Sequence, residues 1–316
     1  MMDTGAGMKN KLVTLIGGGG FVGRYLAQGL MRSGARVRLA QRDPRQAYFV
    51  RAQAALGQMQ FASADLTRPD SIARALDGAS MAVNLVGAFA GNLAAVHVTG
   101  PEELARQAER AGLEALVHIS AIGADSAAAS VYARTKGEGE AAVVAAFRNA
   151  TVLRPSVIFG REDQFLNRFA QLIERLPVVP VLRGGARFQP VYVADVADAI
   201  VAALKDAARF GGRTLELGGP DVMTMGEIYR FLATETGRTP RFLDLPDIAG
   251  AVLARLPGAP LSVDQWLMLQ SDSVVTGENG LLTLGVTPTA MAAVAPGYLV
   301  RYHKAGRFGV RAAVEA

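Results

Sequence analysis

The chain has 316 residues, half of them hydrophobic, which is enough to bury one large α/β domain or a domain with an attached smaller lobe. Its formal net charge of +5 comes without a dense block of basic residues interleaved with aromatic ones, which argues against nucleic acid as a main partner. The chain contains no cysteine. This composition excludes disulfides, thiolate nucleophiles and metals held by cysteine.

The start of the chain shows no targeting pattern. Residues 1–11 contain neither the apolar core of a signal peptide nor the Arg- and Ser-rich amphipathic pattern of a transit peptide. No stretch approaches the roughly 18 to 20 apolar residues that cross a bilayer. We therefore expect a cytoplasmic protein without a transmembrane segment, whose contact with a membrane, if any, is peripheral at the inner face.

Segments typical of strands alternate with segments typical of helices up to about residue 160. The expected strands are 12–16, 36–41, 58–62, 81–86, 115–120 and 150–154. The expected helices are 21–33, 45–56, 69–77, 100–111 and 132–147. Apolar strands that are each followed by a crossover helix predict a parallel sheet covered on both faces. The order is that of a doubly wound, Rossmann-type α/β fold.

The alternation then weakens, because prolines and glycines punctuate the chain. A further strand at 191–193 and a helix at 194–205 are expected to pack with the first domain (the segment 191–205). We therefore predict a dinucleotide-binding domain over 9–160 and a smaller, partly helical C-terminal lobe with a tail over 161–316.

The predicted C-terminal lobe has few regular patterns. Between Arg238 and Pro260, four prolines and several Leu and Ala residues predict short irregular helices. The tail from Arg301 to Arg311 carries basic and aromatic residues. This composition is typical either of a solvated, frayed terminus or of a surface that docks on an acidic protein or a lipid.

A glycine-rich turn lies at the first strand–helix junction. It satisfies both the Gly18-x-Gly20-x-x-Gly23 spacing and the looser Gly17-x-x-Gly20-x-x-Gly23 spacing. Without a Cβ, the backbone turns sharply and approaches a pyrophosphate, whose charge the positive helix end and its free N–H groups hold. The candidate cofactor contacts are therefore Gly17, Gly18, Gly20, Phe21, Val22 and Gly23.

The end of the second predicted strand indicates which cofactor is bound. NAD enzymes usually carry a carboxylate there that accepts a hydrogen bond from the ribose 2′-OH, whereas Gln41 and Arg42 offer donors and a positive charge suited to a 2′-phosphate. We expect NADPH or NADP, with Arg42 as the contact, because Pro44 turns the backbone away just after Asp43. NAD is the alternative if Asp43 points at the ribose. A charge-assisted contact contributes roughly 1.5–3 kcal/mol, enough for about tenfold preference.

Two more strand ends supply candidate cofactor contacts. Asp65 and Leu66 follow the third strand, where such folds place an acid near the adenine amino group. Asp65 alternatively caps the helix that begins near Pro69. Val86 and Gly87 end the fourth strand, and Gly87 would leave space where the cofactor crosses the carboxyl ends of the sheet.

Ser120, Tyr132 and Lys136 form the candidate catalytic group. Tyr132 and Lys136 lie four residues apart, hence on one face of a predicted helix, and Ser120 ends the preceding strand. In a dehydrogenase the phenol transfers a proton as hydride moves, the ammonium lowers the pKa of the phenol, and the serine hydroxyl binds the substrate oxygen. The three histidines are far apart in sequence, so no metal site is expected.

With these motifs the chain resembles the short-chain dehydrogenase/reductase superfamily, in its extended or atypical branch. Longer runs resemble one particular family, the nucleotide-binding accessory subunits of respiratory complex I (NADH:ubiquinone oxidoreductase) and their bacterial relatives. The runs are 117–124, 132–140, 153–163, 189–197 and 284–288. The resemblance spans nearly the whole chain.

This resemblance implies a bound NADPH, with the glycine turn, Arg42 and Pro155 among its contacts. It also implies that the nucleotide is a structural or sensing element in a protein associated with the respiratory NADH dehydrogenase. Tyr132 and Lys136 would then only hold the nicotinamide ribose. The partners that it implies are complex I subunits or a membrane surface.

One departure from the extended relatives concerns a proton relay. Where they have an asparagine in an Asn-Val-x-Gly-Thr run, this chain has His97 followed by Val98-Thr99-Gly100-Pro101. His97 is either a substitute relay or a structural or surface residue at a helix start. The segment between Ser120 and Tyr132 is too short for the usual substrate loop of a nucleotide-sugar epimerase.

Two alternatives to an accessory subunit stay open. One is an active NADP-dependent oxidoreductase that reduces a small carbonyl substrate with Tyr132 as the acid. The other is an NADPH-sensing regulatory protein, whose affinity for protein partners changes with the redox state of the cofactor. The fold alone does not choose among the three.

Overall fold

The computed structural model describes residues 8–255 and 261–304. The chain divides into two compact units, each built from separate segments. Among the described residues, unit 1 comprises the chain up to Pro155, Val193–Leu217 and Gly277–Thr287. Unit 2 comprises Ser156–Tyr192, Gly218–Thr276 and the chain from Pro288 on.

Unit 1 is built on a seven-stranded parallel sheet with the strand order β11-β6-β5-β4-β1-β2-β3. The predicted doubly wound, Rossmann-type fold is therefore confirmed. Its strands are β1 (Leu12–Ile16), β2 (Arg36–Gln41), β3 (Met59–Ser63), β4 (Met81–Asn84), β5 (Ala115–Ile119), β6 (Thr151–Pro155) and β11 (Thr214–Leu217). The sequence did not predict β11, which adds an edge strand beside β6.

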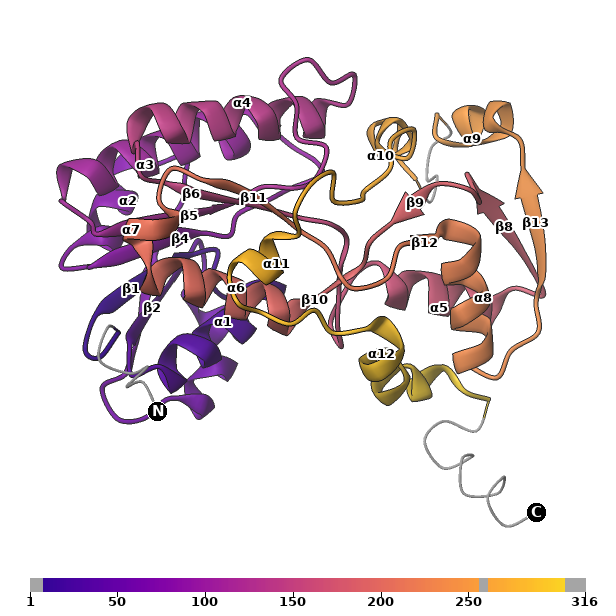
Figure 1. The fold of residues 1–316 in the computed structure, drawn as a ribbon, viewed down its shortest axis with the longest axis horizontal. Helices are drawn as coiled ribbons and strands as arrows, with labels where there is room; N and C mark the ends of the chain where they lie inside the picture. The colour runs from indigo at the N-terminus through magenta and orange to yellow at the C-terminus, as the bar shows by residue number, and fades with distance from the viewer. Residues whose placement is uncertain (1–7, 256–260, 305–316) are drawn as a thin grey trace, which may run out of the picture. The chain divides into compact units, whose positions relative to one another are not determined.

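Helices cover both faces of this sheet (Figure 1). One face carries α2 (Pro69–Leu76), α3 (Gly100–Arg110) and α4 (Val131–Ala146), and the other carries α1 (Phe21–Arg32) and α6 (Val193–Lys205). Fully buried strands such as β1 and β5 explain why the sequence shows continuous apolar runs rather than alternation. Two short helices, α7 (Ala207–Phe210) and α11 (Gly280–Thr283), complete the unit.

One predicted helix of unit 1 differs from the expectation, and one helical segment was not predicted. The segment expected as a helix over 45–56 is a 3₁₀ helix, η1 (Pro44–Gln53), with Asp43 as its N-cap. A π-helix, η2 (Ala95–Thr99), directly precedes α3. It packs against α4 at Gly139, where a Cβ would lie 1.8 Å from the carbonyl oxygen of His97. Only glycine allows that approach.

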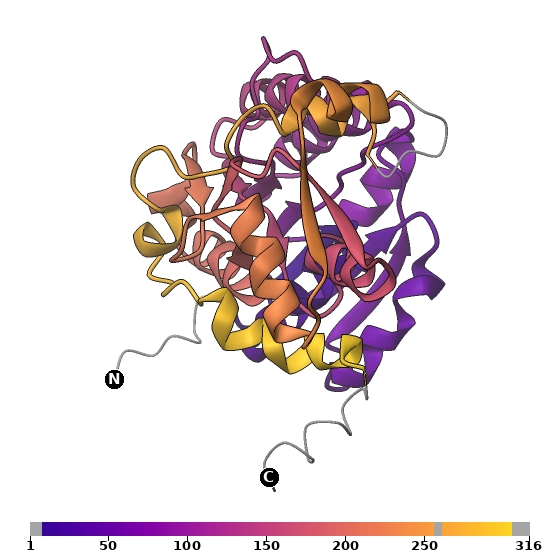
Figure 2. The same ribbon diagram turned by 90° about the vertical axis from the view of Figure 1, so that its right-hand side faces the viewer.

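Unit 2 contains three strand pairs around its own apolar core. The pairs are β7 (Ile158–Phe159) with β10 (Val191–Tyr192), β9 (Arg187–Phe188) with β12 (Met223–Thr224), and β8 (Val178–Leu182) with β13 (Arg241–Leu245). Its helices are α5 (Leu166–Arg175), α8 (Met225–Glu235), α9 (Asp247–Leu253), α10 (Val263–Met268), α12 (Met291–Leu299) and the 3₁₀ turn η3 (Val300–Tyr302). Figure 2 shows α8 beside the β8–β13 pair.

Two expectations for the C-terminal lobe are wrong. Residues 241–245, expected within short irregular helices, form β13 because they pair in parallel with β8. The start of the basic and aromatic tail is not frayed, since Tyr302 is buried and its hydroxyl donates to Asn167 Oδ1 at 3.0 Å. The remainder of that cluster, 305–311, lies outside the described residues. No helix within 8–255 or 261–304 is long and apolar enough to span a bilayer.

Candidate nucleotide-binding site

The glycine-rich turn after β1 leaves no room for side chains. Gly17 has a φ of +79°, which favours glycine. A Cβ on Gly18 would lie 2.6 Å from Leu39 Cδ2, and a Cβ on Gly23 would lie 2.2 Å from the carbonyl oxygen of Gly18. Gly20 is the N-cap of α1, so the amides of Phe21, Val22 and Gly23 in the first turn have no acceptor within the helix. This cradle fits a pyrophosphate.

Gln41 at the end of β2 ties this turn to the neighbouring strand. Its Oε1 accepts from the backbone N–H of Gly19 at 2.9 Å, and its Nε2 donates to the carbonyl oxygen of Asp43 at 2.7 Å. Gln41 thus has a structural role that the sequence did not predict, and its direct donation to the ribose phosphate stays a prediction.

Asp43 is also committed to the protein. Its Oδ1 accepts from the backbone N–H of Arg45 at 3.1 Å and from Arg45 Nε at 3.0 Å. The hydrogen bond and charge of Arg45 lower the pKa of this carboxyl. Arg42, which precedes it, is exposed; its carbonyl oxygen accepts from Ser63 Oγ at 3.1 Å, and its charge contributes to the lowered pKa of Asp65.

The next strand end differs in part from the prediction. Asp65 does not cap α2, whose N-cap is Arg68. Its Oδ1 instead accepts from the N–H and the hydroxyl of Thr67, at 2.9 and 2.8 Å. The Leu66 side chain lies in the core of unit 1, so only its backbone can meet a cofactor.

Space exists at the end of β4, where the sequence predicts that the cofactor crosses the sheet. A Cβ on Gly87 would meet no atom of the described residues within 4 Å. Val86 lies against the glycine turn, since its Cγ2 would be 3.1 Å from a Cβ on Gly17. Asn84, which the sequence analysis did not single out, shapes this end because its Oδ1 accepts from Val86 N–H at 3.1 Å.

Tyr132 lies in the first turn of α4. Ser130 begins that helix by accepting from Ala133 N–H at 3.2 Å. The Tyr132 ring stacks on Phe89 with 4.6 Å between centroids and meets His97 edge-on at 5.3 Å. Burial raises the pKa of Tyr132 to about 12. Desolvation of the phenol thus acts against the lowering of its pKa that the sequence predicts.

Lys136 crosses from α4 to the end of β5. Its Nζ donates to the carbonyl oxygen of Ile119 at 2.7 Å, and the side chain is buried. Burial lowers the pKa of Lys136 to about 8, which the charge of Glu140 partly opposes. Ser120 follows Ile119, and its buried Oγ has no hydrogen-bond partner among the described residues. At the end of β6, the carbonyl oxygen of Pro155 accepts from Ile122 N–H at 3.1 Å.

His97 is held as a structural residue. Its Nε2 accepts from the backbone N–H of Ala88 at 3.1 Å, so its Nδ1 carries the proton and contacts Thr135 Oγ1 at 2.9 Å. Burial, with a smaller effect of the Lys136 charge, lowers the pKa of His97 to about 4. The engagement of both ring nitrogens favours the interpretation of His97 as a structural residue over that of a substitute proton relay.

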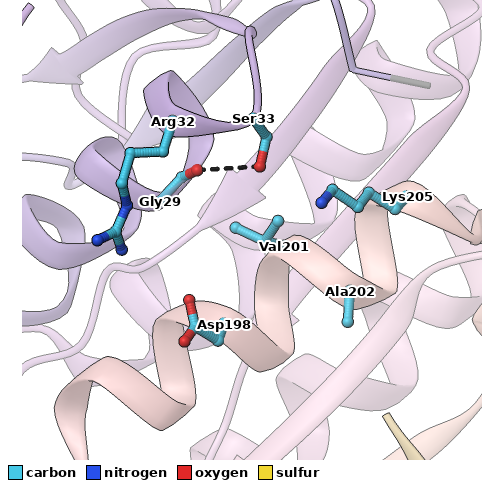
Figure 3. A pocket seen from close by; sticks show the side chains of 7 residues that line it. All are labelled: Gly29, Arg32, Ser33, Asp198, Val201, Ala202 and Lys205. Atoms are coloured by element: carbon cyan, nitrogen blue, oxygen red, sulfur yellow. Dashed lines mark hydrogen bonds between the residues drawn. The ribbon is translucent and has the colours of Figure 1, made fainter. Parts of the chain in front are cut away.

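A separate open depression lies between α1 and α6 (Figure 3). Arg32 and Ser33 line it from the end of α1, and Asp198 and Lys205 line it from α6. It contains none of the predicted nucleotide contacts, which begin at the opposite end of α1. Within the described ranges, no three histidines or acidic residues gather as a metal would require.

The site thus combines a glycine cradle, open space at Gly87 and a Tyr-x-x-x-Lys pair at the carboxyl ends of parallel strands. These features define a dinucleotide-binding protein of the Rossmann type. Residues 13–218 match the NAD dependent epimerase/dehydratase family. The chain belongs to this family, in the extended branch of the short-chain dehydrogenases/reductases.

Several relatives carry respiratory names. The chain is 34% identical to "NADH dehydrogenase [ubiquinone] 1 alpha subcomplex subunit 9, mitochondrial" of Arabidopsis thaliana, over 93% of this chain and 79% of the relative. It is 33% identical to the protein of the same name from Mus musculus, over 89% and 77%. The predicted resemblance to complex I accessory subunits is confirmed. A ceramide reductase of Caulobacter vibrioides is 30% identical over 84% and 81%.

Solved structures agree on the fold. An NADPH-dependent quinone oxidoreductase from Escherichia coli, complexed with NADPH, aligns with a TM-score of 0.74 at 19% identity, covering 91% of this chain and 99% of that one. The dTDP-glucose 4,6-dehydratase of Streptomyces venezuelae aligns with a TM-score of 0.71 at 17% identity, covering 94% and 98%. At these identities the likeness shows the fold alone.

Proposed function

We propose that this protein holds NADPH as a resident nucleotide and serves the respiratory NADH dehydrogenase as an accessory subunit. The choice of NADPH over NADH rests on the contacts of the Asp43 carboxylate. This carboxylate is the N-cap of η1 and pairs with Arg45, which favours Arg42 over Asp43 as the contact of the adenosine ribose. Arg42 then supplies the charge that a 2′-phosphate requires.

A structural or sensing role of the nucleotide is supported by the relatives and by the state of the Tyr-x-x-x-Lys pair. Identity to proteins named as subunits of the respiratory enzyme extends over about nine-tenths of the chain. Tyr132 is stacked on Phe89 and has a raised pKa, which disfavours the phenolate. Lys136 would bind the nicotinamide ribose and the glycine cradle the pyrophosphate, which would order the strand ends around NADPH.

The choice of nucleotide is tested by calorimetry on ligand-free protein with Arg42→Ala. Loss of one charge-assisted contact should weaken NADPH binding by about tenfold or more and leave NADH binding unchanged. Arg51→Ala, an exposed arginine of η1, is the matched control. Equal weakening of both nucleotides by Arg42→Ala would contradict selection of the 2′-phosphate.

The association is tested by affinity capture of the tagged chain from mildly solubilised native membranes. Respiratory NADH dehydrogenase subunits should be enriched with the wild-type protein. They should be lost with Gly18→Ala, whose Cβ clashes inside the cradle. Recovery of the chain without these subunits would contradict an accessory role.

An active reductase is the second candidate. It is favoured by the placement of Ser120, Tyr132 and Lys136 at the end of β5 and the start of α4, and by the similarity to a ceramide reductase. When bound, NADPH supplies a hydride. Ser120 would hold a carbonyl oxygen, Tyr132 would donate a proton to it, and Lys136 would orient the ribose.

Turnover decides between the two. Rapid NADPH oxidation with a panel of small and long-chain carbonyl compounds, abolished by Tyr132→Phe, would overturn the structural role. The accessory-subunit proposal expects no turnover by the wild-type protein, and a folded Tyr132→Phe protein in which the ring stacking on Phe89 is kept. A partner affinity that changes with the cofactor redox state would instead identify an NADPH-sensing regulator.

A further inference from the structure

His118 is a buried histidine whose tautomer follows from its neighbours. Asn84 Oδ1 accepts from Val86 N–H, so the Asn84 amide is oriented with its Nδ2 toward His118 Nδ1, 3.0 Å away. Nδ2 is a donor, hence Nδ1 accepts and the proton of the neutral ring lies on Nε2. His118 is only 1% exposed, and its Nε2 has no hydrogen-bond partner within residues 8–255 and 261–304. An interior N–H donor is therefore left unsatisfied.

A second unsatisfied polar atom lies on the same face of β5. Side chains alternate along a strand, so Ser120 follows His118 on one face. This is the face of Leu116, which packs with residues of α3 and α4 in the core. Ser120 Oγ is buried and also has no hydrogen-bond partner in the part of the chain that the structure describes. Buried polar atoms without partners cost about 1–3 kcal/mol each, so proteins normally satisfy them with water or ligand.

Lys136 belongs to the same buried region. Its ammonium donates one hydrogen bond to Ile119, the residue between His118 and Ser120, and retains two further N–H donors. An interior water molecule needs two to four polar partners. The two unsatisfied atoms and the ammonium offer three: His118 Nε2–H and Lys136 donate to the water, and Ser120 accepts from it.

We propose that His118 and Ser120 hold one interior water molecule beside Lys136, which makes His118 a positioning residue for that ammonium. Water suits this place better than a polar group of a substrate, because His118 lies within β5, two residues before Ser120, which follows the carboxyl end of that strand. The proposed water site adds to the proposed NADPH site. Its test by NADPH affinity rests on the proposed function.

The charged and titratable groups around Lys136 come from three elements. Tyr132 and Glu140 lie on the same helix, His118 on β5, and His97 on the π-helix. Burial first, and then the charge of Lys136, keep the pKa of His118 well below its usual range. The ring thus acts on Lys136 as a neutral donor that holds water, and the water solvates the ammonium.

The experiment measures NADPH affinity against pH for the full-length protein. Wild-type affinity should fall at alkaline pH as Lys136 loses its proton. His118→Phe removes the donor and should move this midpoint to lower pH by about one unit, a tenfold change in the proton affinity of Lys136. His118→Gln, whose amide donates from a similar position, should restore it. His303→Gln, a histidine of unit 2, should leave the midpoint unchanged.

An unchanged midpoint in a folded His118→Phe protein that binds NADPH at pH 6.5 would overturn the inference. If that variant does not fold, a high-resolution crystal structure of the wild-type protein decides. Water density within hydrogen-bond distance of both His118 Nε2 and Ser120 Oγ supports the inference, and its absence overturns it. Failure of the wild-type protein to bind NADPH would remove the proposed function, while the crystal structure would still decide the water site.

Discussion

The backbone N–H of Gly19 donates to Oε1 of Gln41 at 2.9 Å, which joins the glycine turn to the end of the adjacent strand. A Cβ at position 19 would lie 2.1 Å from that oxygen. Gln41 also donates to the carbonyl oxygen of Asp43, where η1 begins. A single amide side chain therefore fixes both the pyrophosphate cradle and the backbone beside Arg42.

The variant Gln41→Glu tests this relationship. Glutamate keeps an acceptor for Gly19 N–H but loses the donor to Asp43 and adds a negative charge near the expected 2′-phosphate. NADPH affinity should fall by about tenfold or more, with a smaller effect on NADH. Calorimetry with both nucleotides measures the ratio of the NADPH and NADH affinities. Gln46→Glu, on the exposed side of η1, is the control. A preserved NADPH:NADH ratio would show that Gln41 does not shape the phosphate site.

Glycine substitutions separate binding from stability. Gly87→Ala meets no atom within 4 Å, so the free energy of unfolding of the nucleotide-free protein should change by less than about 0.5 kcal/mol. NADPH affinity should nevertheless fall by about tenfold or more, because the methyl group occupies space assigned to the cofactor. Gly277→Ala, also in open space, should change neither quantity. Unimpaired NADPH binding by Gly87→Ala would place the cofactor elsewhere.

Acid should destabilise the nucleotide-free protein through His97. Its pKa is about 4 in the folded chain against an ordinary 6.5, so the unfolded chain binds more protons between these values. The contribution of His97 to the free energy of unfolding is therefore fully present above pH 6.5. It should fall by up to about 3 kcal/mol as the pH decreases toward 4. Denaturant unfolding across this range should show a shallower loss for His97→Gln. If the free energy of unfolding depended on pH in the same way in His97→Gln and in the wild type, His97 would not be the source of the acid destabilisation.

The sequence predicted those parts of the site that depend on local pattern. The glycine turn and the Tyr132–Lys136 pair were found because a strand–turn–helix junction and an i, i+4 spacing are local features. The N-cap role of Asp43 was missed although its signal is local as well, an acceptor side chain directly before Pro44.

Other features depend on contacts between distant segments and were not predictable from one sequence. The π-helix around His97 packs on Gly139 of another helix. The pairing of Asn84 with His118 requires the register between β4 and β5. The raised pKa of Tyr132 follows from burial that only the packed structure reveals.

Unit 2 is expected to depend on two tyrosine hydroxyls near its C-terminal end. Tyr298 donates to Asp163 Oδ2 at 3.2 Å, and Tyr302 donates to Asn167 Oδ1 at 3.0 Å, in a buried setting. Removing either hydroxyl should reduce the free energy of unfolding by about 1–3 kcal/mol, because a buried acceptor loses a partner. Tyr298→Phe and Tyr302→Phe are compared with Tyr48→Phe at an exposed position. Equal stability of all three variants would contradict this role.

The most direct test of the whole account is isothermal titration calorimetry on folded protein stripped of nucleotide. The account predicts saturable binding of NADPH at one site per chain, about tenfold or more tighter than NADH. Absence of binding heat at several temperatures for NADPH, NADP, NADH and NAD alike would contradict it.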